Sequence, residues 1–260
     1  RHLTAAGFRP RHFISRHRAS AEAAAACCGA GVAVETFEAL TPAPEILWIT
    51  TPDDCIEEVA QGLARAGAVG SGTAVLHCSG LLSSEVLEAV RQAGAAAGSL
   101  HPLQSVPVRC MASNPFQGVP MAVEGDPAAV ARAREAAAAL GGAAMEVATA
   151  GKALYHAAAV TASNYLVTLM DAALRLLEGA GIPAAAGWPL LEPLVQGTLG
   201  NIRSVGAEAA LTGPVARGDV ATLRAHQAAI HGGVPDLAAF YNRLGAATVA
   251  LAARRGAVSE

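Results

Sequence analysis

The stretch Thr73-Ala-Val-Leu-His77-Cys-Ser79-Gly80, together with Ala95-Ala-Ala-Gly-Ser-Leu-His101-Pro102, decides the fold. Each is a short apolar run that leads to a histidine, which is the pattern of a buried strand. In an open parallel sheet, ligands bind beyond the carboxyl ends of the strands. We therefore expect His77, Ser79 and His101 to project into one cleft, where a hydroxyl and two imidazoles suit proton transfer.

Each of these residues alone also has a simpler interpretation. Ser79-Gly80 could form only a turn and a helix N-cap, and His101 could merely precede a proline that stiffens a loop. The pairing of two polar strand ends favours the functional interpretation. Cys78 has no activating base predicted beside it, so we interpret it as a small buried side chain.

Short apolar runs alternate with helical segments up to about residue 148, which predicts a parallel sheet covered by helices on both faces. The expected strands are 11–15, 32–35, 45–50, 73–77, 95–100, 119–123 and 144–147, and the expected helices are 19–29, 54–66, 83–93 and 127–140. After Gly151 the pattern is helical only, over 152–179, 189–206, 219–231 and 235–255. The predicted fold class is α/β, with a Rossmann-type domain over 1–148 and an all-helical domain over 149–260.

The first residues resemble the end of a helix. Residues 1–7 have the pattern of last helical turns closed by a glycine C-cap, and the strand 11–15 follows. A Rossmann-type domain begins with a strand and a glycine-rich turn. We expect both to be missing from the sequence as given.

Composition narrows the class of partner. Of the 260 residues, 53% are hydrophobic, and much of that share is alanine, which favours helix packing over a membrane span. No uninterrupted apolar stretch reaches the ~18–20 residues that cross a bilayer. The net charge of −3 gives no general attraction to nucleic acid or anionic lipid. The five cysteines show no metal-ligand spacing, which predicts free thiols in a reducing cytoplasm and no metal site.

Ser15, Arg16 and Arg18 lie just beyond the strand 11–15, which would be the second strand of a dinucleotide fold. An acidic residue there would hold the ribose hydroxyls of NAD, whereas an arginine accommodates the 2′-phosphate of NADP. We see no acid at that strand end, so the sequence favours NADP. The alternative is a solvated basic turn.

Two further strand ends offer groups to the same cofactor. The backbone of Thr50, Thr51 and Pro52, which follow the strand 45–50, would line the cofactor site together with His77. Asp53 or Asp54 is expected to cap the next helix.

Lys152 and His156 are four residues apart, so they share one face of the predicted helix 152–179, with Tyr155 beside them and Asn164 two turns further along. A lysine and a histidine together can bind an acidic substrate and relay a proton. The alternative is a solvated lysine and a hydrogen-bonded core histidine.

The connector between the last helices is rich in glycine. Thr212-Gly213-Pro214 predicts a turn, and Asp219 is a natural N-cap for the helix that follows. Arg217 would bind a phosphate or carboxylate, or pair with a neighbouring acid.

Five motifs of the sequence together resemble a bacterial family of Rossmann-like proteins. They are Leu76-His-Cys-Ser-Gly80, Ser99-Leu-His-Pro-Leu-Gln104, Lys152 with Tyr155-His-Ala-Ala158, Ser163-Asn-Tyr165 and Leu211-Thr-Gly-Pro-Val-Ala-Arg-Gly-Asp219. Its C-terminal half is known only as a domain of unknown function. The family is similar in plan to 6-phosphogluconate dehydrogenase, pyrroline-5-carboxylate reductase and ketopantoate reductase. The resemblance implies an NAD(P)-dependent oxidoreductase with a helical, dimer-forming domain.

The resemblance also has departures. In related β-hydroxyacid dehydrogenases a lysine and an asparagine four apart serve the reaction, and here Lys152 matches the lysine but His156 replaces the asparagine. Ser79 and His101-Pro102 are similar to the serine and histidine that prephenate dehydrogenases place around the substrate hydroxyl, which implies a cyclic or acidic substrate.

The leading hypothesis is a cytoplasmic, homodimeric NADP-dependent oxidoreductase that acts on a small polar or acidic substrate at the interdomain cleft. Lys152, His156 and His101 are the candidates for proton transfer, Ser79 positions the substrate, and Asn164 belongs to the same candidate set. The alternatives are a non-catalytic NADP-binding regulator on the same scaffold and a protein whose helical domain serves only assembly.

Overall fold

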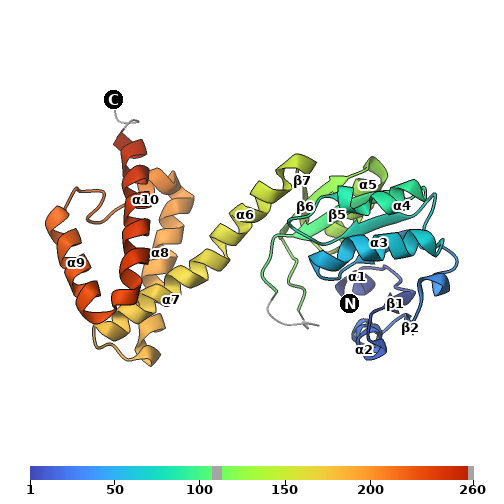
Figure 1. The fold of residues 1–260 in the computed structure, drawn as a ribbon, viewed down its shortest axis with the longest axis horizontal. Helices are drawn as coiled ribbons and strands as arrows, with labels where there is room; N and C mark the ends of the chain where they lie inside the picture. The colour runs from blue at the N-terminus through green and yellow to red at the C-terminus, as the bar shows by residue number, and fades with distance from the viewer. Residues whose placement is uncertain (107–112, 257–260) are drawn as a thin grey trace. The chain divides into compact units, whose positions relative to one another are not determined.

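The computed structural model describes residues 1–106 and 113–256, and it divides into two compact units, Arg1–Ser163 and Asn164–Glu260 (Figure 1). The sequence pattern changes at 148/149, whereas the unit boundary comes after the helix α6 (Lys152–Ala162). Lys152, Tyr155 and His156 therefore belong to the first unit.

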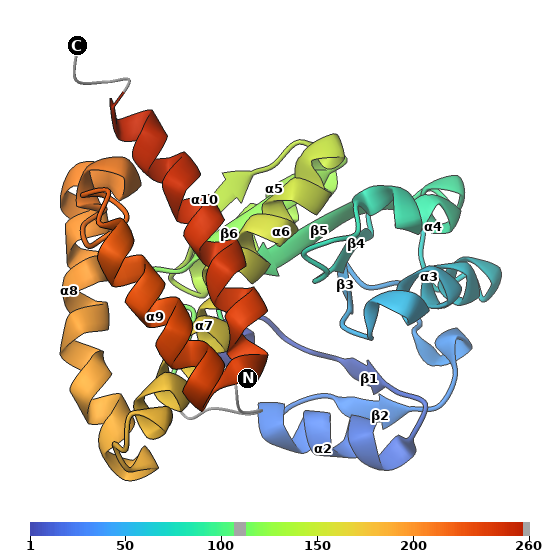
Figure 2. The ribbon, with the colours of Figure 1, turned by 60° about the vertical axis from the view of Figure 1, so that its left-hand side comes forward.

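The first unit contains two sheets. The strands β1 (His12–Ile14) and β2 (Val32–Val34) pair in parallel, with the helix α2 (Arg18–Cys28) packed on them (Figure 2). The second sheet has the order β3-β4-β5-β6-β7. Its strands are β3 (Ile46–Ile49), β4 (Ala74–His77), β5 (Ala96–Pro102), β6 (Pro120–Gly125) and β7 (Ala143–Glu146). The helices of this unit besides α2 and α6 are α1 (His2–Ala5), α3 (Ile56–Arg65), α4 (Glu88–Gln92) and α5 (Pro127–Ala139). All the predicted strands and helices of residues 1–148 are confirmed to within a few residues.

One pairing departs from the predicted parallel sheet. The strand β6 runs antiparallel to β5, with Ser99 opposite Glu124 and His101 opposite Ala122. Parallel neighbours need a long crossover, usually a helix, whereas antiparallel neighbours do not. The described part of the connection from β5 to β6 contains no helix.

Each face of the five-stranded sheet carries its own core. On one face Val75 and Ala97 pack with apolar side chains of α3 and of residues 84–92, and on the other Leu76 and Leu100 pack against the alanines of α5. Because side chains alternate along a strand, His77, Ser99 and His101 share the face of Val75 and Ala97. The alternation therefore places several polar side chains on one face, near the carboxyl ends of β4 and β5.

The second unit is helical. It contains α7 (Asn164–Gly179), α8 (Ala184–Ala210), α9 (Val220–Gly233) and α10 (Ala238–Gly256), with a small core at Ala172, Ile230 and Leu237. Figures 1 and 2 show α8, α9 and α10 side by side.

Two helix predictions need correction. The expected single helix 152–179 is assigned as α6 and α7, which meet at Ser163. The helix predicted to begin at Pro189 begins at Ala184 instead, so that Pro189 and Pro193 lie inside α8, and Gly206 interrupts its helical backbone with φ 80°. Proline favours helix starts but does not exclude an interior place when neighbouring contacts offset its cost.

One segment passes a simple test for a membrane span. Thr149–Gly179 has a mean hydropathy of 1.2 in its most apolar window, of which 6% is buried. The expectation that no uninterrupted apolar stretch reaches the length of a span still holds, because Thr161, Ser163 and Asn164 interrupt this segment. Length and composition alone are weak evidence, because a helix that packs against another protein passes the same test.

The cysteines also need a correction. Cys28, Cys55 and Cys78 are free thiols, but Cys27 is disulfide-bonded, so the prediction of free thiols throughout is wrong for this residue. A disulfide depends on two cysteines that the tertiary structure brings within about 7 Å between Cα atoms, which spacing in the sequence does not reveal.

Candidate functional site

Three consecutive strands end at one edge of the sheet and bring predicted site residues together. Asp53 follows β3, Ser79 follows β4 and His101 lies near the end of β5. The Ser79 hydroxyl donates to Asp53 Oδ2 at 2.6 Å. The same hydroxyl oxygen accepts from the backbone N–H groups of Leu81 and Leu82, at 3.1 and 2.9 Å.

These contacts give Ser79 a local role. Its hydroxyl closes the turn after β4 and ties that turn to the loop after β3, and all its partners are protein groups. We expected the carboxylate of Asp53 to be a candidate helix cap. It accepts a hydrogen bond from the Ser79 hydroxyl instead and does not cap a helix. Whether Ser79 also positions a substrate stays a prediction.

His77 is completely buried and contacts the backbone of the loop that follows β4. Its Nδ1 accepts from the backbone N–H of Ser79 at 3.2 Å, and its Nε2 lies 3.2 Å from the carbonyl oxygen of Ser83. Burial first, and the charge of the nearby Lys152 ammonium second, lower the pKa of His77 to about 4. The ring is therefore neutral at pH 7, and the cofactor role predicted for His77 would act through the loop that it supports.

Lys152 lies under this loop, with 2% of its surface exposed. Its Nζ donates to the carbonyl oxygen of Ser79 at 2.8 Å and to the hydroxyl of Ser99 at 3.0 Å. Burial lowers the pKa of this ammonium, and the negative charges of Glu124 and Asp53 oppose that shift. The residue is neither solvated nor surface-exposed, so the simpler interpretation of this lysine is wrong.

His101 lies between two aromatic partners from α6. Its Nδ1 is 2.9 Å from the hydroxyl of Tyr155, and its ring lies 6.2 Å from that of His156, edge to face. Burial lowers the pKa of His101 to about 4, with the charge of Lys152 as the next cause. Burial also raises the pKa of Tyr155.

Gly80 lets these rings approach the loop. A Cβ at this position would lie 2.7 Å from Cδ2 of His156 and 2.9 Å from Nε2 of His101. Both rings therefore rest on the backbone of Gly80, and a larger residue would displace them. The structure thus brings together Ser79, His101, Lys152 and His156, four of the five predicted catalytic residues.

Asn164 begins α7 in the second unit, where its side chain is exposed. Its carbonyl oxygen accepts from the hydroxyl of Thr168 at 3.4 Å. Its catalytic role stays a prediction.

The predicted cofactor residues lie at exposed strand ends. Ser15, Arg16 and Arg18 are exposed, as are Thr50, Thr51 and Pro52. Arg18 differs from the expectation of an arginine without acidic partners, because its guanidinium pairs with Glu22 at 2.8 Å and with Glu35 at 2.7 Å. Arg16 forms no ion pair among the described residues, so of these two arginines it is the one whose guanidinium is available to an anion.

Sequence reasoning did not assign a site role to Asp53, Ser99, Glu124 or Tyr155. Tyr155 could have been found from its place beside Lys152 and His156. Ser99 could have been found because it lies two residues before His101 and therefore on the same face of the strand. Glu124 carries only one signal, an acid inside an apolar run, which is unusual for a buried strand.

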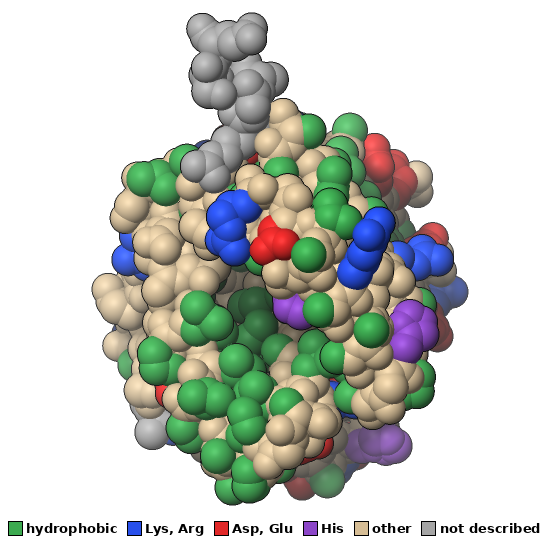
Figure 3. Space-filling view, turned by 90° about the vertical axis from the view of Figure 1, so that its left-hand side faces the viewer, with side chains coloured by type: hydrophobic (Ala, Val, Ile, Leu, Met, Phe, Trp, Pro, Cys, Tyr) green, Lys and Arg blue, Asp and Glu red, His purple; other side chains and the backbone are tan. Residues whose placement is uncertain are grey.

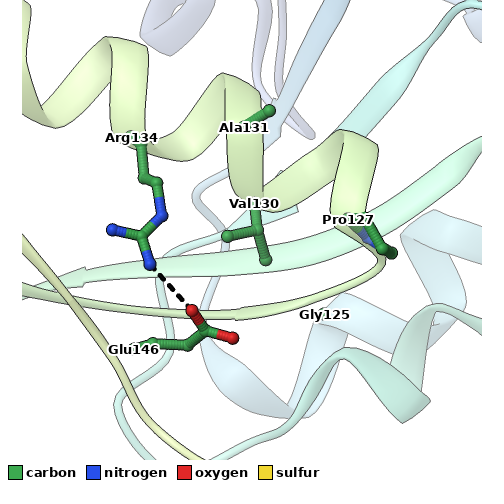
Figure 4. Close-up of a pocket in the computed structure, with 6 residues that line it drawn as sticks. All are labelled: Gly125, Pro127, Val130, Ala131, Arg134 and Glu146. Atoms are coloured by element: carbon green, nitrogen blue, oxygen red, sulfur yellow. Dashed lines mark hydrogen bonds and ion pairs between the residues drawn. The ribbon is translucent and has the colours of Figure 1, made fainter.

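The described residues also form a surface hollow of about 300 Å³ over α5 and β7, shown in Figure 4. Its lining includes the ion pair between Arg134 and Glu146, at 2.7 Å, and no residue of the predicted site. No group of three or more potential metal ligands occurs among the residues that the structure describes.

Comparison with known families identifies the class of protein. Residues 5–102 match the Rossmann-like domain, and residues 119–248 match the domain of unknown function DUF2520. The fold and these matches define a protein with a Rossmann-like domain followed by a helical domain. Within that class, the chain belongs to the DUF2520 family, as the sequence resemblance implied.

Solved structures share this fold. Protein TM1727 from Thermotoga maritima is 26% identical, with a TM-score of 0.70 over 93% of this chain and 90% of that chain. The candidate NADP oxidoreductase BF3122 from Bacteroides fragilis is 20% identical, with a TM-score of 0.76 over 95% and 91%. A reductive aminase from Aspergillus terreus, solved with NADPH and ethyl levulinate, is 17% identical, with a TM-score of 0.66 over 95% and 87%. No curated protein matches the chain.

Proposed function

We propose that the protein is an NADP-dependent oxidoreductase that acts on a small polar or acidic substrate, with His101, Tyr155 and His156 as the groups that handle the proton. The observation that supports this best is the contact of 2.9 Å between His101 and Tyr155, beside His156 and above Gly80. This cluster lies where three strands end, which is the usual ligand edge of such a sheet.

The exposed strand ends fit a dinucleotide. The guanidinium of Arg16, just after β1, suits a 2′-phosphate, and the exposed residues Thr50 to Pro52 offer backbone polar groups at the end of β3. NADPH, when bound, would supply a hydride to the substrate. The names of the solved relatives, which mention NADP or NADPH, support this choice of cofactor.

The proton chemistry follows from the two shifted pKa values. With its pKa near 4, His101 is neutral at pH 7, while Tyr155, with its raised pKa, keeps its proton. With its proton on Nδ1, the neutral imidazole can donate to the phenol oxygen and orient it, so that the phenol gives its single proton to a substrate oxygen or nitrogen and is left as a phenolate that the imidazole N–H stabilises. The buried charge of Lys152 beneath the loop favours a substrate that carries negative charge.

We also propose a cytoplasmic location and a homodimer. The free thiols Cys28, Cys55 and Cys78 support a reducing compartment, whereas the disulfide at Cys27 does not. Cell fractionation with thiol labelling decides between a reducing and an oxidising compartment. The argument for the dimer belongs to the whole molecule and is given in the Discussion.

Two titrations test the cofactor. By calorimetry, NADPH should bind at least about tenfold more tightly than NADH, a difference of about 1.4 kcal/mol. Arg16→Ala should narrow this preference, whereas Arg11→Ala, an exposed arginine before β1, should preserve it. Equal affinity for both nucleotides in the wild type would contradict the NADP assignment.

A substrate screen tests the chemistry. NADPH consumption is followed with small oxo acids, ketones and imines, and His101→Asn and Tyr155→Phe are then compared with the wild type. Each should lower kcat by about a hundredfold or more, as for the loss of a general acid or base. His226→Asn is the matched control, since His226 pairs with Tyr241 at 2.7 Å in the second unit. Tight NADPH binding without turnover of any substrate would favour a non-catalytic NADP-binding regulator.

A further inference from the structure

The chain contains a single lysine, and it is the buried Lys152, because the other members of its 18 lysine and arginine residues are all arginines. An arginine carries a planar fork with five donors and stays charged, whereas a lysine carries a compact ammonium whose pKa responds to burial. The one position that uses lysine is therefore the one where a small, tunable cation lies inside the protein.

No carboxylate contacts this ammonium directly in the described structure. Its hydrogen-bond partners are the carbonyl oxygen of Ser79 and the hydroxyl of Ser99, both neutral. The hydroxyl of Ser99 in turn donates to Glu124 Oε1 at 2.8 Å. A buried cation without a nearby anion is costly, so the carboxylate behind Ser99 is the group that offsets its charge.

Glu124 is itself 3% exposed and accepts from four donors. Besides Ser99, it accepts from the backbone N–H of Ser84 at 2.7 Å, from the hydroxyl of Ser84 at 3.0 Å and from the hydroxyl of Thr149 at 3.2 Å. Thr149 begins the short turn that leads into α6, the helix that carries Lys152, Tyr155 and His156. Glu124 thus contacts both the hydroxyl that holds Lys152 and the start of its helix.

The antiparallel pairing of β5 and β6 produces this arrangement. Ser99 lies directly opposite Glu124 in the register, so the two side chains share one face of the sheet. A parallel strand at that place would have followed a crossover and a different register.

We propose that Glu124 is a positioning residue, which acts through the hydroxyl of Ser99 to hold the Lys152 ammonium charged and in place beneath the Ser79-Gly80 loop. This role for Glu124 rests on the proposed oxidoreductase function only because Lys152 lies in the site proposed for it. The remaining titratable groups around Lys152 are Asp53 after β3, His77 and Cys78 from β4 and its loop, His101 from β5, and His156 on its own helix.

The single lysine makes the test direct. In protein labelled with 13C-lysine, the side-chain signals come from Lys152 alone, and their pH dependence gives its pKa without any cofactor or substrate. Glu124→Gln keeps the shape and removes the charge, so the pKa of Lys152 should fall by about one unit or more. The matched control is Glu146→Gln on β7, an exposed glutamate paired with Arg134, which should leave that pKa unchanged.

Each outcome decides the proposal. An unchanged Lys152 pKa in folded Glu124→Gln overturns it. If that variant does not fold, Ser99→Ala decides instead, since it removes only the bridging hydroxyl: a lower pKa supports the proposal, and an unchanged or higher pKa overturns it. A pKa that falls in a protein that never turns over NADPH would leave the positioning role standing and reject the proposed function.

Discussion

The polar residues at the sheet edge form one connected network. Asp53 accepts from Ser79, the Ser79 carbonyl accepts from Lys152, and the Lys152 ammonium reaches Glu124 through Ser99. Among the described residues, no buried side-chain nitrogen or oxygen lacks a hydrogen-bond partner. A satisfied buried network fixes one geometry, because every displaced member leaves an unpaired group.

At the residue scale, Gly80 has the sharpest requirement. Replacing it with alanine places a Cβ within 3 Å of both histidine rings, so either the rings or the loop must move. We expect Gly80→Ala to lower the free energy of unfolding by about 1–3 kcal/mol, as for overpacking in a well-packed interior. Urea unfolding measures this, and histidine NMR shows whether the rings of His101 and His156 are displaced.

Gly70→Ala is the control for that substitution. A Cβ at Gly70 would meet its nearest atom at 3.8 Å, which is ordinary contact, so this variant should unfold near the wild-type urea midpoint. If Gly80→Ala is equally stable and its histidine signals do not shift, the close approach does not constrain the site.

At the scale of elements, a specific side chain caps the start of α9. Asp219 was predicted to cap α9, and the structure confirms it: its Oδ1 accepts from the backbone N–H of Thr222 at 3.0 Å, and its Oδ2 accepts from the Thr222 hydroxyl at 2.7 Å. These bonds to the charged form also lower the pKa of Asp219. The cap therefore satisfies one backbone donor that the helix itself leaves free.

Removal of this cap should weaken the helical unit. We expect Asp219→Ala to lower its free energy of unfolding by about 1 kcal/mol, within the range of about 0.5–2 kcal/mol for lost N-caps. Urea unfolding followed by the circular dichroism of the helices measures this loss of stability. Glu192→Ala, an exposed acid within α8, should change stability by less than about 0.5 kcal/mol. Equal effects of the two changes would argue against a capping role.

At the scale of the whole molecule, the helical unit leaves much apolar surface uncovered. Figure 3 shows hydrophobic side chains gathered on the face drawn there. The exposed large apolar residues of α7 and α8 are Tyr165, Val167, Leu169, Trp188, Leu190, Leu194, Leu199, Ile202 and Val205. Soluble monomers seldom expose a large contiguous apolar patch, so the unit is expected to pair with a second copy.

The dimer is tested by sedimentation at low-micromolar concentration. The wild type should sediment as a dimer, and Val167→Glu combined with Leu194→Glu should sediment as a monomer, because charges inside an apolar interface lose their water. These two side chains are 69% and 67% exposed, respectively. Val32→Glu, at a 58% exposed position on β2, should leave the dimer intact. A monomeric wild type would reject the prediction.

The sequence by itself determined most of the elements and several neighbours in the site. Short apolar runs and helical segments bounded by glycine located the strands and helices of residues 1–148, because local patterns record which segments are buried. Spacing alone placed Lys152 and His156 on one helix face, and the strand-end rule placed Ser79 and His101 at one edge of the sheet.

Only the tertiary structure decided how these elements and side chains pair. The reversal of β6, which sets Glu124 opposite Ser99, depends on the path between two strands rather than on either strand's pattern. The same holds for Arg18, whose partner Glu35 lies 17 residues away, and for the disulfide at Cys27. Such contacts arise from packing across long sequence separations, and a local pattern carries no record of a distant partner.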